Sequence, residues 1–227
     1  MHIWTHRGNP GPENTLEGFS QAWIDGITHF ETDIHCTNDG VLVLAHDSDI
    51  SRLTGVKREI KDLSWKELQN YKIDGQYDWT TLDELHEHFD QARISIDIKS
   101  DHALEPFLRW AHEKDLSQYV VGSFSTVRVN QVRKTYPHLT TSLTSREILY
   151  AAAGFGRLLP AHSGERVAMV PAHFKGVKIL TQSFVSFCSQ HAIDINVWTI
   201  NSPTELEQIN HLGINGIITD TYHQFIG

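Results

Sequence analysis

A histidine and an arginine side by side, at the end of an apolar run, are the first residues that could do chemistry. His6, Arg7 and Gly8 directly follow residues 1–5. Histidine titrates near neutral pH, arginine offers a planar fork to phosphate or carboxylate, and glycine lets the backbone turn sharply beside a ligand. The trio indicates a site for an anionic substrate, although a polar turn at a strand end would have the same composition. The Glu-Asn-Thr run at 13–15 is interpreted as structural, since it would cap the first helix and pack against the loop.

Two acidic residues share one face of the next expected strand. Because side chains alternate along a strand, Glu31 and Asp33 point the same way as His35. Like charges in a dry interior repel each other, so a hard divalent cation, Mg²⁺ or Ca²⁺, is their natural partner. The alternative is a solvated edge strand, but Phe30 and Ile34 on the opposite face could pack against helices. His35 could be a third ligand, but it is interpreted as a neighbour of the metal site.

Three further groups end later apolar runs. His46, beside Asp47, can donate or accept a proton, although most of the 15 histidines must be bystanders. Asp97 and Lys99 share a strand face, which fits a metal with a phosphate but also an internal ion pair. Trp198 could form an apolar wall for the carbon skeleton of a ligand, or it could belong to the core.

The elements that must position these groups alternate between short apolar runs and amphipathic stretches. Strands are expected at residues 1–5, 30–35, 41–45, 93–99, 119–123, 139–143, 167–170, 196–200 and 214–219, and helices at 15–25, 81–89, 103–113, 126–135, 145–153, 182–191 and 203–212. If 41–45 extends the second unit as a hairpin, about eight strand–helix repeats of roughly 28 residues remain. This pattern predicts a single (β/α)8 TIM barrel over residues 1–227. An open doubly wound sheet would usually carry a glycine-rich phosphate loop after its first strand, which is absent here.

One segment departs from the alternation. Residues 48–77 are predicted to form a small excursion over one barrel mouth, with a short helix at 64–70.

Composition narrows the function classes. The chain has 227 residues, 40% of them hydrophobic and 21% charged, which is typical of a soluble globular protein. A net charge of −9 argues against nucleic acid as a partner. Two cysteines cannot form a disulfide framework and suit a reducing compartment. There is no apolar run for stable membrane insertion and no signal peptide, so a cytoplasmic location is expected. No feature assigns an oligomeric state.

Taken in order along the whole chain, these motifs resemble the glycerophosphodiester phosphodiesterase family. The motifs are His6-Arg7-Gly8 with Pro12-Glu13-Asn14-Thr15, Glu31-Thr32-Asp33, His46-Asp47, Ile96-Asp97-Ile98-Lys99, Ser123-Phe124, Trp198-Thr199-Ile200-Asn201 and Thr219-Asp220. The first three, with this spacing, are hard to obtain by chance.

The resemblance implies a (β/α)8 barrel, one divalent cation (Mg²⁺ or Ca²⁺), and hydrolysis of a glycerophosphodiester to glycerol 3-phosphate and an alcohol. It also implies a route in which a glycerol hydroxyl attacks phosphorus and water then opens the cyclic phosphate. Carried over by position, the metal ligands are Glu31, Asp33 and Asp97, the general base is His6, the general acid is His46, and the phosphate contacts are Arg7 and Lys99. Trp198 is expected to contact the substrate.

Two departures from the family pattern and three alternative functions stay open. Asp97 stands where the family usually has Glu, and Trp79 precedes Thr80-Thr81-Leu82 where a Pro before Thr-Leu is typical. The excursion at 48–77 is also short, and this segment bears on substrate choice. A barrel phospholipase that releases a cyclic phosphate and a lysophospholipase D-like enzyme with an apolar groove would use the same groups. A non-catalytic barrel would be expected to lack a histidine or an acid.

Overall fold

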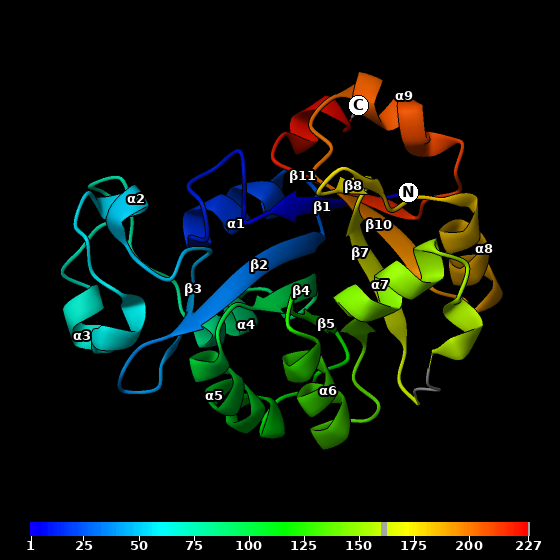
Figure 1. Ribbon diagram of the computed structural model, residues 1–227. Coiled ribbons are helices and arrows are strands. Elements are labelled where there is room, and N and C mark those ends of the chain that lie inside the picture. The colour runs from blue at the N-terminus through cyan, green and yellow to red at the C-terminus, as the bar shows by residue number, and fades with distance from the viewer. Residues whose placement is uncertain (160–162, 227) are drawn as a thin grey trace.

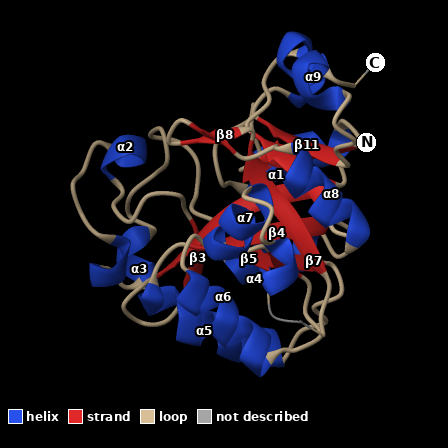
Figure 2. Cartoon of the chain, turned by 45° about the vertical axis from the view of Figure 1, so that its right-hand side comes forward, coloured by secondary structure: helices blue, strands red, loops and turns tan. Residues whose placement is uncertain are grey.

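The computed structural model describes residues 1–159 and 163–226. Within this part of the chain, eight parallel strands form a closed barrel surrounded by helices (Figures 1 and 2). The barrel strands are β1 (His2–His6), β2 (His29–Cys36), β4 (Arg93–Ile98), β5 (Tyr119–Gly122), β6 (Thr141–Ser142), β7 (Arg166–Pro171), β10 (Asp194–Trp198) and β11 (Gly216–Thr219). The barrel closes because β1 pairs in parallel with both β2 and β11. The predicted (β/α)8 barrel is therefore confirmed.

The helices connect successive barrel strands and begin at polar caps. They are α1 (Leu16–Ile24), α4 (Leu82–His88), α5 (Asp101–His112), α6 (Thr126–Thr135), α7 (Ser145–Ala152), α8 (Gln182–Gln190) and α9 (Pro203–Asn210). Thr15, Thr181 and Ser202 each accept a hydrogen bond from a backbone N–H three residues on. Such a bond satisfies a donor that the first helical turn would otherwise leave free, which explains why each helix starts there.

The predicted excursion lies between β3 (Leu42–Leu44) and α4. Strand β3 runs antiparallel to β2, as expected of a hairpin extension. It leads into α2 (Ser51–Thr54), the 3-10 turn η1 (Ile60–Asp62) and α3 (Trp65–Leu68), drawn in cyan at the left of Figure 1. This segment has a small apolar core of its own, made of Val43, Ala45, Ile50, Ile60, Leu63, Leu68, Ile73 and Trp79. The helix expected at 64–70 is only the single turn of α3.

Other short elements were not predicted. After β7 the chain forms a two-stranded antiparallel hairpin of β8 (His173–Phe174) and β9 (Val177–Lys178). Two further 3-10 turns are η2 (Gly156–Leu158) and η3 (Tyr222–Gln224). The strand expected at 139–143 is reduced to the two residues of β6. Elements of two or three residues carry too little periodicity to be read from a sequence.

Apolar side chains from β1, β5 and β11 pack together inside the barrel. Trp4, Val120 and Ile218 are buried there, and the Trp4 indole donates a hydrogen bond to the Asn196 side chain. Trp4 and His6 point to the same side of β1 because they are two residues apart. The packed interior therefore leaves the polar residues at the carboxyl ends of the strands, where barrel enzymes hold their catalytic groups. Among the described helices, none is long and apolar enough to cross a lipid bilayer.

Candidate active site

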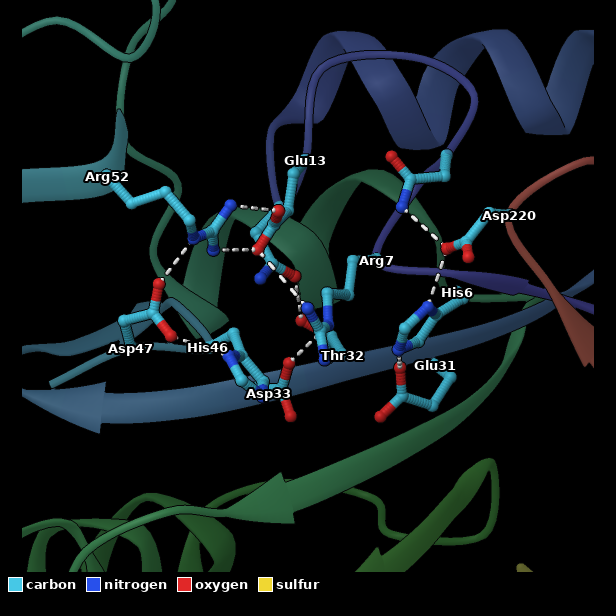
Figure 3. Close-up of polar contacts among 12 residues, drawn as sticks. His6, Arg7, Glu13, Glu31, Thr32, Asp33, His46, Asp47, Arg52 and Asp220 are labelled. Atoms are coloured by element: carbon cyan, nitrogen blue, oxygen red, sulfur yellow. Dashed lines mark hydrogen bonds and ion pairs between the residues drawn. The ribbon is translucent and has the colours of Figure 1, made fainter. Parts of the chain in front are cut away.

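Strand register brings the expected site residues together. His6 lies level with Glu31 on the paired strands β1 and β2, and Asp33 lies level with Asp97 on β2 and β4. Lys99 follows β4 directly. Figure 3 shows the first three of these side chains converging from neighbouring strands. The prediction that Glu31 and Asp33 share a face is thus confirmed.

The loop after β1 is held in place by its backbone. Arg7 adopts a left-handed conformation with φ of 59°, which is unfavourable for a residue with a Cβ. Two hydrogen bonds hold it there, because its N–H donates to the Glu31 carbonyl and its carbonyl accepts from the N–H of Asn14. Asn14 is buried and accepts a hydrogen bond from the Thr32 hydroxyl. The structural interpretation of Asn14 is confirmed.

Asp33 is the most enclosed charge in the site. Its side chain is only 3% exposed, and it lies between two cations. Arg7 Nε is 2.8 Å from Asp33 Oδ2, although the pair is not aligned for a hydrogen bond. Lys99 Nζ is 3.0 Å from Asp33 Oδ1 and 3.1 Å from Asp97 Oδ2. The internal ion pair considered for Asp97 and Lys99 is therefore present.

Burial shifts the ionisation of these groups. Desolvation, together with the nearby charge of Asp33, raises the pKa of Glu31 well above its usual value. Desolvation likewise raises the pKa of Asp97. Burial alone would lower the pKa of Lys99, but the carboxylates of Asp33 and Asp97 outweigh this effect and raise the pKa of Lys99. The mouth thus holds more buried negative charge than its two cations balance.

Three buried carboxylate oxygens decide whether the site offers suitable ligands for a metal ion. Glu31 Oε2, Asp33 Oδ2 and Asp97 Oδ1 are each buried and accept no hydrogen bond. Oxygen donors of this kind are the ligands that Mg²⁺ and Ca²⁺ prefer. Among residues 1–159 and 163–226, no three acidic, histidine or cysteine side chains already converge in the geometry of a metal centre. The donor set fits a divalent cation in its chemistry, and Lys99 and Arg7 lie beside the oxygens it would use.

His6 is oriented by a residue from the other end of the chain. Its Nδ1 lies 2.7 Å from Asp220 Oδ1, and its Nε2 faces Glu31 Oε2 at 3.8 Å (Figure 3). Asp220 also accepts hydrogen bonds from the side chains of Asn9 and Asn201. Partial burial opposes ionisation of Asp220, but the hydrogen bond with His6 and those from the two amides lower its pKa to about 2. An ionised Asp220 keeps the proton of the imidazole on Nδ1, which leaves Nε2 as the acceptor.

His46 is held by a chain of ion pairs that reaches into the excursion. Its Nδ1 is 2.7 Å from Asp47 Oδ1, and Asp47 Oδ2 accepts from Arg52 Nε at 2.6 Å. The two terminal nitrogens of Arg52 donate to both oxygens of Glu13, at 2.8 and 2.9 Å. Partial burial alone would raise the pKa of Asp47, but the hydrogen bonds from Arg52 and His46 outweigh it and lower this pKa.

Glu13 requires a correction. The sequence interpretation made it part of a helix cap, but the cap is Thr15, which accepts from the N–H of Gly18. Glu13 instead contacts Arg52 and, at 3.5 Å, Arg7. It therefore links the loop after β1 with the excursion.

The pocket at this mouth has two unlike walls. Its volume is about 290 Å³. The polar wall contains His6, Arg7, Glu31, Asp33, His46, Asp97 and Lys99. The apolar wall contains Phe124, Leu143, Ile148, Leu149, Met169, Pro171, Phe174, Ile179 and Trp198, and it meets the polar wall where Lys99 Nζ lies 5.6 Å from the centre of the Phe124 ring. Trp198 meets Phe124 edge-on with 6.2 Å between ring centroids, so it faces the pocket, as one of its two sequence interpretations requires.

All eight site residues expected from sequence line this one pocket. Sequence reasoning did not assign Asp220, Glu13 or Arg52 to the site. For Asp220 a signal existed, since it ends β11 and so must lie at the same mouth. Arg52 carried no signal, because its position in the excursion follows no strand periodicity.

Comparison with known proteins gives consistent matches over nearly the full chain. The model of the "Glycerophosphoryl diester phosphodiesterase family" matches residues 6–223. A glycerophosphodiester phosphodiesterase of Caldanaerobacter subterraneus is 27% identical over 96% of this chain and 93% of its own. The structure of such an enzyme from Thermotoga maritima superposes with a TM-score of 0.77 at 27% identity, covering 99% of this chain and 96% of that one. A phosphodiesterase of Oleispira antarctica, solved with sn-glycerol 3-phosphate, has a TM-score of 0.75 at 21% identity and covers 100% and 95% of the two chains.

Fold, site and matches together define a (β/α)8-barrel phosphoric diester hydrolase. Because the family model covers residues 6–223, the chain belongs to the glycerophosphodiester phosphodiesterase family.

The contact between His6 and Asp220 generates a prediction. Asp220→Asn should lower kcat by about 10²-fold or more, because the imidazole loses the anion that fixes its tautomer and stabilises its protonated form. KM should change much less. The measurement is steady-state hydrolysis of a glycerophosphodiester.

Asp25→Asn is the matched control, since Asp25 is a hydrogen-bonded carboxylate that contacts Tyr222 outside the pocket. A kcat for Asp220→Asn equal to that of Asp25→Asn would contradict the orienting role of Asp220.

Proposed function

We propose that this protein is a metal-dependent phosphodiesterase that hydrolyses glycerophosphodiesters to glycerol 3-phosphate and an alcohol. The observation that carries the proposal is the pairing of two histidines, each held by its own carboxylate, in one pocket with three buried carboxylate oxygens that accept no hydrogen bond. Membership of the family supports the substrate class. The product bound to the solved Oleispira antarctica phosphodiesterase is also consistent with it.

Arg7 and Lys99 are proposed to bind the phosphate. Both line the pocket, and both are fixed by Asp33, so their positive charges are in place before substrate arrives. Preorganised cations stabilise the charge that builds on phosphoryl oxygens during displacement. One Mg²⁺ or Ca²⁺, held by Glu31, Asp33 and Asp97, would add a further positive charge at those oxygens.

The two histidines are proposed to move protons in opposite directions. A glycerol hydroxyl attacks phosphorus and gives its proton to His6, while the bond to the leaving alcohol breaks and that oxygen takes a proton from His46. Water then attacks the cyclic phosphate with the roles reversed, which returns both histidines to their starting states. Acid–base help of this kind contributes about 10²–10⁴ in rate.

Exposure favours this assignment of roles. The His6 side chain is 18% exposed, whereas that of His46 is 36% exposed. A base that lies deeper in the pocket is shielded from water, which could otherwise replace the glycerol hydroxyl as its proton donor. The more open position of His46 suits a group that protonates an alcohol on its way out of the pocket.

The apolar wall favours a second candidate substrate. A lysophospholipase D-like activity requires room for an acyl chain, and the wall around Phe124, Leu149 and Trp198 offers an apolar surface beside the catalytic groups. A cyclic phosphate as the final product is the other alternative to be tested. A cytoplasmic location is retained as part of the proposal, in keeping with the free, buried thiols of Cys36 and Cys188.

The function is tested by identifying products. A panel of glycerophosphodiesters with different head-group alcohols should yield glycerol 3-phosphate, and a lysophospholipid should yield a lysophosphatidic acid if the second candidate holds. EDTA should abolish turnover, and Mg²⁺ or Ca²⁺ should restore it. Full turnover in an exhaustively chelated sample would overturn the metal site, and accumulation of a cyclic phosphate would redirect the assignment.

The side chain of Asp97, which is shorter than that of the Glu usual in the family, gives a second prediction. If Asp97 ligates the metal, Asp97→Glu should keep an affinity for Mg²⁺ or Ca²⁺ close to that of the unmodified chain, because the charge is retained. Asp97→Asn should lose at least about 10-fold in affinity. Titration calorimetry measures both. Equal affinity for Asp97→Asn and for the exposed control Asp101→Asn would leave Asp97 as a partner of Lys99 only.

The leaving group separates the roles of the histidines. A p-nitrophenyl ester of glycerol phosphate departs as a stable anion and hardly needs protonation, whereas glycerophosphoethanolamine releases a poor alkoxide. His46→Ala should therefore be rescued in part by the p-nitrophenyl ester, while His6→Ala should be damaged about equally on both substrates. The exposed His88→Ala is the control. The reverse pattern would exchange the two assignments.

A further inference from the structure

The apolar wall of the pocket continues outward onto the surface. Phe124, Leu149 and Phe174 line the pocket and yet are 57%, 51% and 41% exposed. Val177, which is 53% exposed, lies opposite Phe174 in the β8–β9 hairpin. We call these four residues the apolar rim. Large apolar side chains gathered at one place on a surface mark a site of contact with a partner, a ligand or a membrane.

The hairpin that carries half of the rim lies outside the barrel sheet. Figure 2 shows β8 apart from the barrel strands, and the two short strands pair only with each other. Residues 173–178 are exposed along their whole length. Ile179 and Leu180, which follow, are buried in the core and anchor the hairpin to the barrel. The hairpin therefore presents Phe174 and Val177 outward from a fixed base.

Basic residues surround the rim. Lys175 occupies the hairpin turn, with its Nζ 5.5 Å from the Phe174 ring, and Lys178 ends the hairpin. Arg146 lies in the first turn of α7, with its guanidinium 5.2 Å from the Tyr150 ring. These side chains can lay their stems along apolar surface while their charged ends stay in contact with polar groups.

The segment that carries three of the four rim residues has few acids. Residues 143–193 contain five Lys and Arg against two acids, whereas the whole chain has 19 against 28. One of the two acids, Glu147, is buried and paired with Arg133 and Arg166. The other, Glu165, precedes β7 and so lies at the amino end of the barrel, away from the mouth. Within this segment, the exposed side chains of Arg146, Lys175 and Lys178 therefore meet no acid that faces the mouth, on a protein of net charge −9.

We propose that the apolar rim and its basic neighbours dock the pocket mouth on an anionic lipid surface. Apolar side chains that enter the headgroup region and basic side chains that contact lipid phosphates are the two components of such binding. A second copy of this chain is disfavoured as the occupant, because it would place Lys175, Lys178 and Arg146 against the same charges. The docking stands on the rim itself. Its consequence, the delivery of acyl-bearing phosphodiesters to the pocket, rests on the proposed function.

Vesicle co-sedimentation of the full chain tests the proposal. Vesicles with about one third phosphatidylserine should retain the protein, vesicles of phosphatidylcholine alone should retain much less, and added salt should weaken binding. Lys175→Gln with Lys178→Gln should lower partitioning by roughly 10-fold or more. Phe174→Ser with Val177→Ser should lower it as well, on vesicles of the same charge.

The matched control is Lys57→Gln with Lys66→Gln, which removes the same charge from two exposed lysines of the excursion. It should bind anionic vesicles as the unmodified chain does. Equal losses in the two lysine pairs, or no binding by the unmodified chain, would overturn the docking.

Hydrolysis of soluble glycerophosphocholine by the Lys175 and Lys178 variant should match that of the unmodified chain. This separates the two proposals. Vesicle binding without hydrolysis of any glycerophosphodiester would contradict the proposed function and leave the docking intact. Hydrolysis without vesicle binding would contradict the docking and leave the proposed function intact.

Discussion

The structure of the mouth depends on the burial of three carboxylates in one end of a narrow barrel. Glu31, Asp33 and Asp97 lie on two paired strands and point into the same interior. Charges of one sign, withdrawn from water, repel one another and must be balanced or neutralised. Arg7 and Lys99 balance part of this charge through Asp33, while burial still raises the pKa values of Glu31 and Asp97. The divalent cation of the proposed function would balance this remaining charge.

Much of the surrounding structure maintains this arrangement. The left-handed backbone of Arg7 is fixed by hydrogen bonds to β2 and to Asn14, so the guanidinium is directed at Asp33. The same loop packs so closely on α1 that a Cβ on Gly18 would collide with the carbonyl oxygen of Pro12. Glycine is therefore required in this helix despite its cost in helix propensity. Glu13 then connects the loop to Arg52, which holds the carboxylate that orients His46.

Sequence periodicity predicts the parts of this site that lie on strands. Alternation places Glu31 with Asp33 and Asp97 with Lys99, and barrel closure then brings them to His6 without further information. The contacts that hold the two histidines are not determined by strand periodicity. Asp220 meets His6 across 214 positions, and Arg52 meets Glu13 across 39, through loops whose conformation depends on the finished fold. The β8–β9 hairpin was missed for a related reason, since two-residue strands have no measurable period.

The two unlike walls also bear on which ester bond the site can cleave. A phosphodiester has two arms, and a pocket with equivalent walls would accept it in either direction. Here Arg7 and Lys99, the proposed phosphate contacts, belong to the polar wall, whereas the chain from β5 to β10 contributes Phe124, Met169 and Trp198. A polar arm gains most beside the charged groups, and an apolar substituent gains most beside the aromatic and aliphatic groups. In the proposed function, the difference between the walls would set the direction of binding, and with it the oxygen that each histidine can reach.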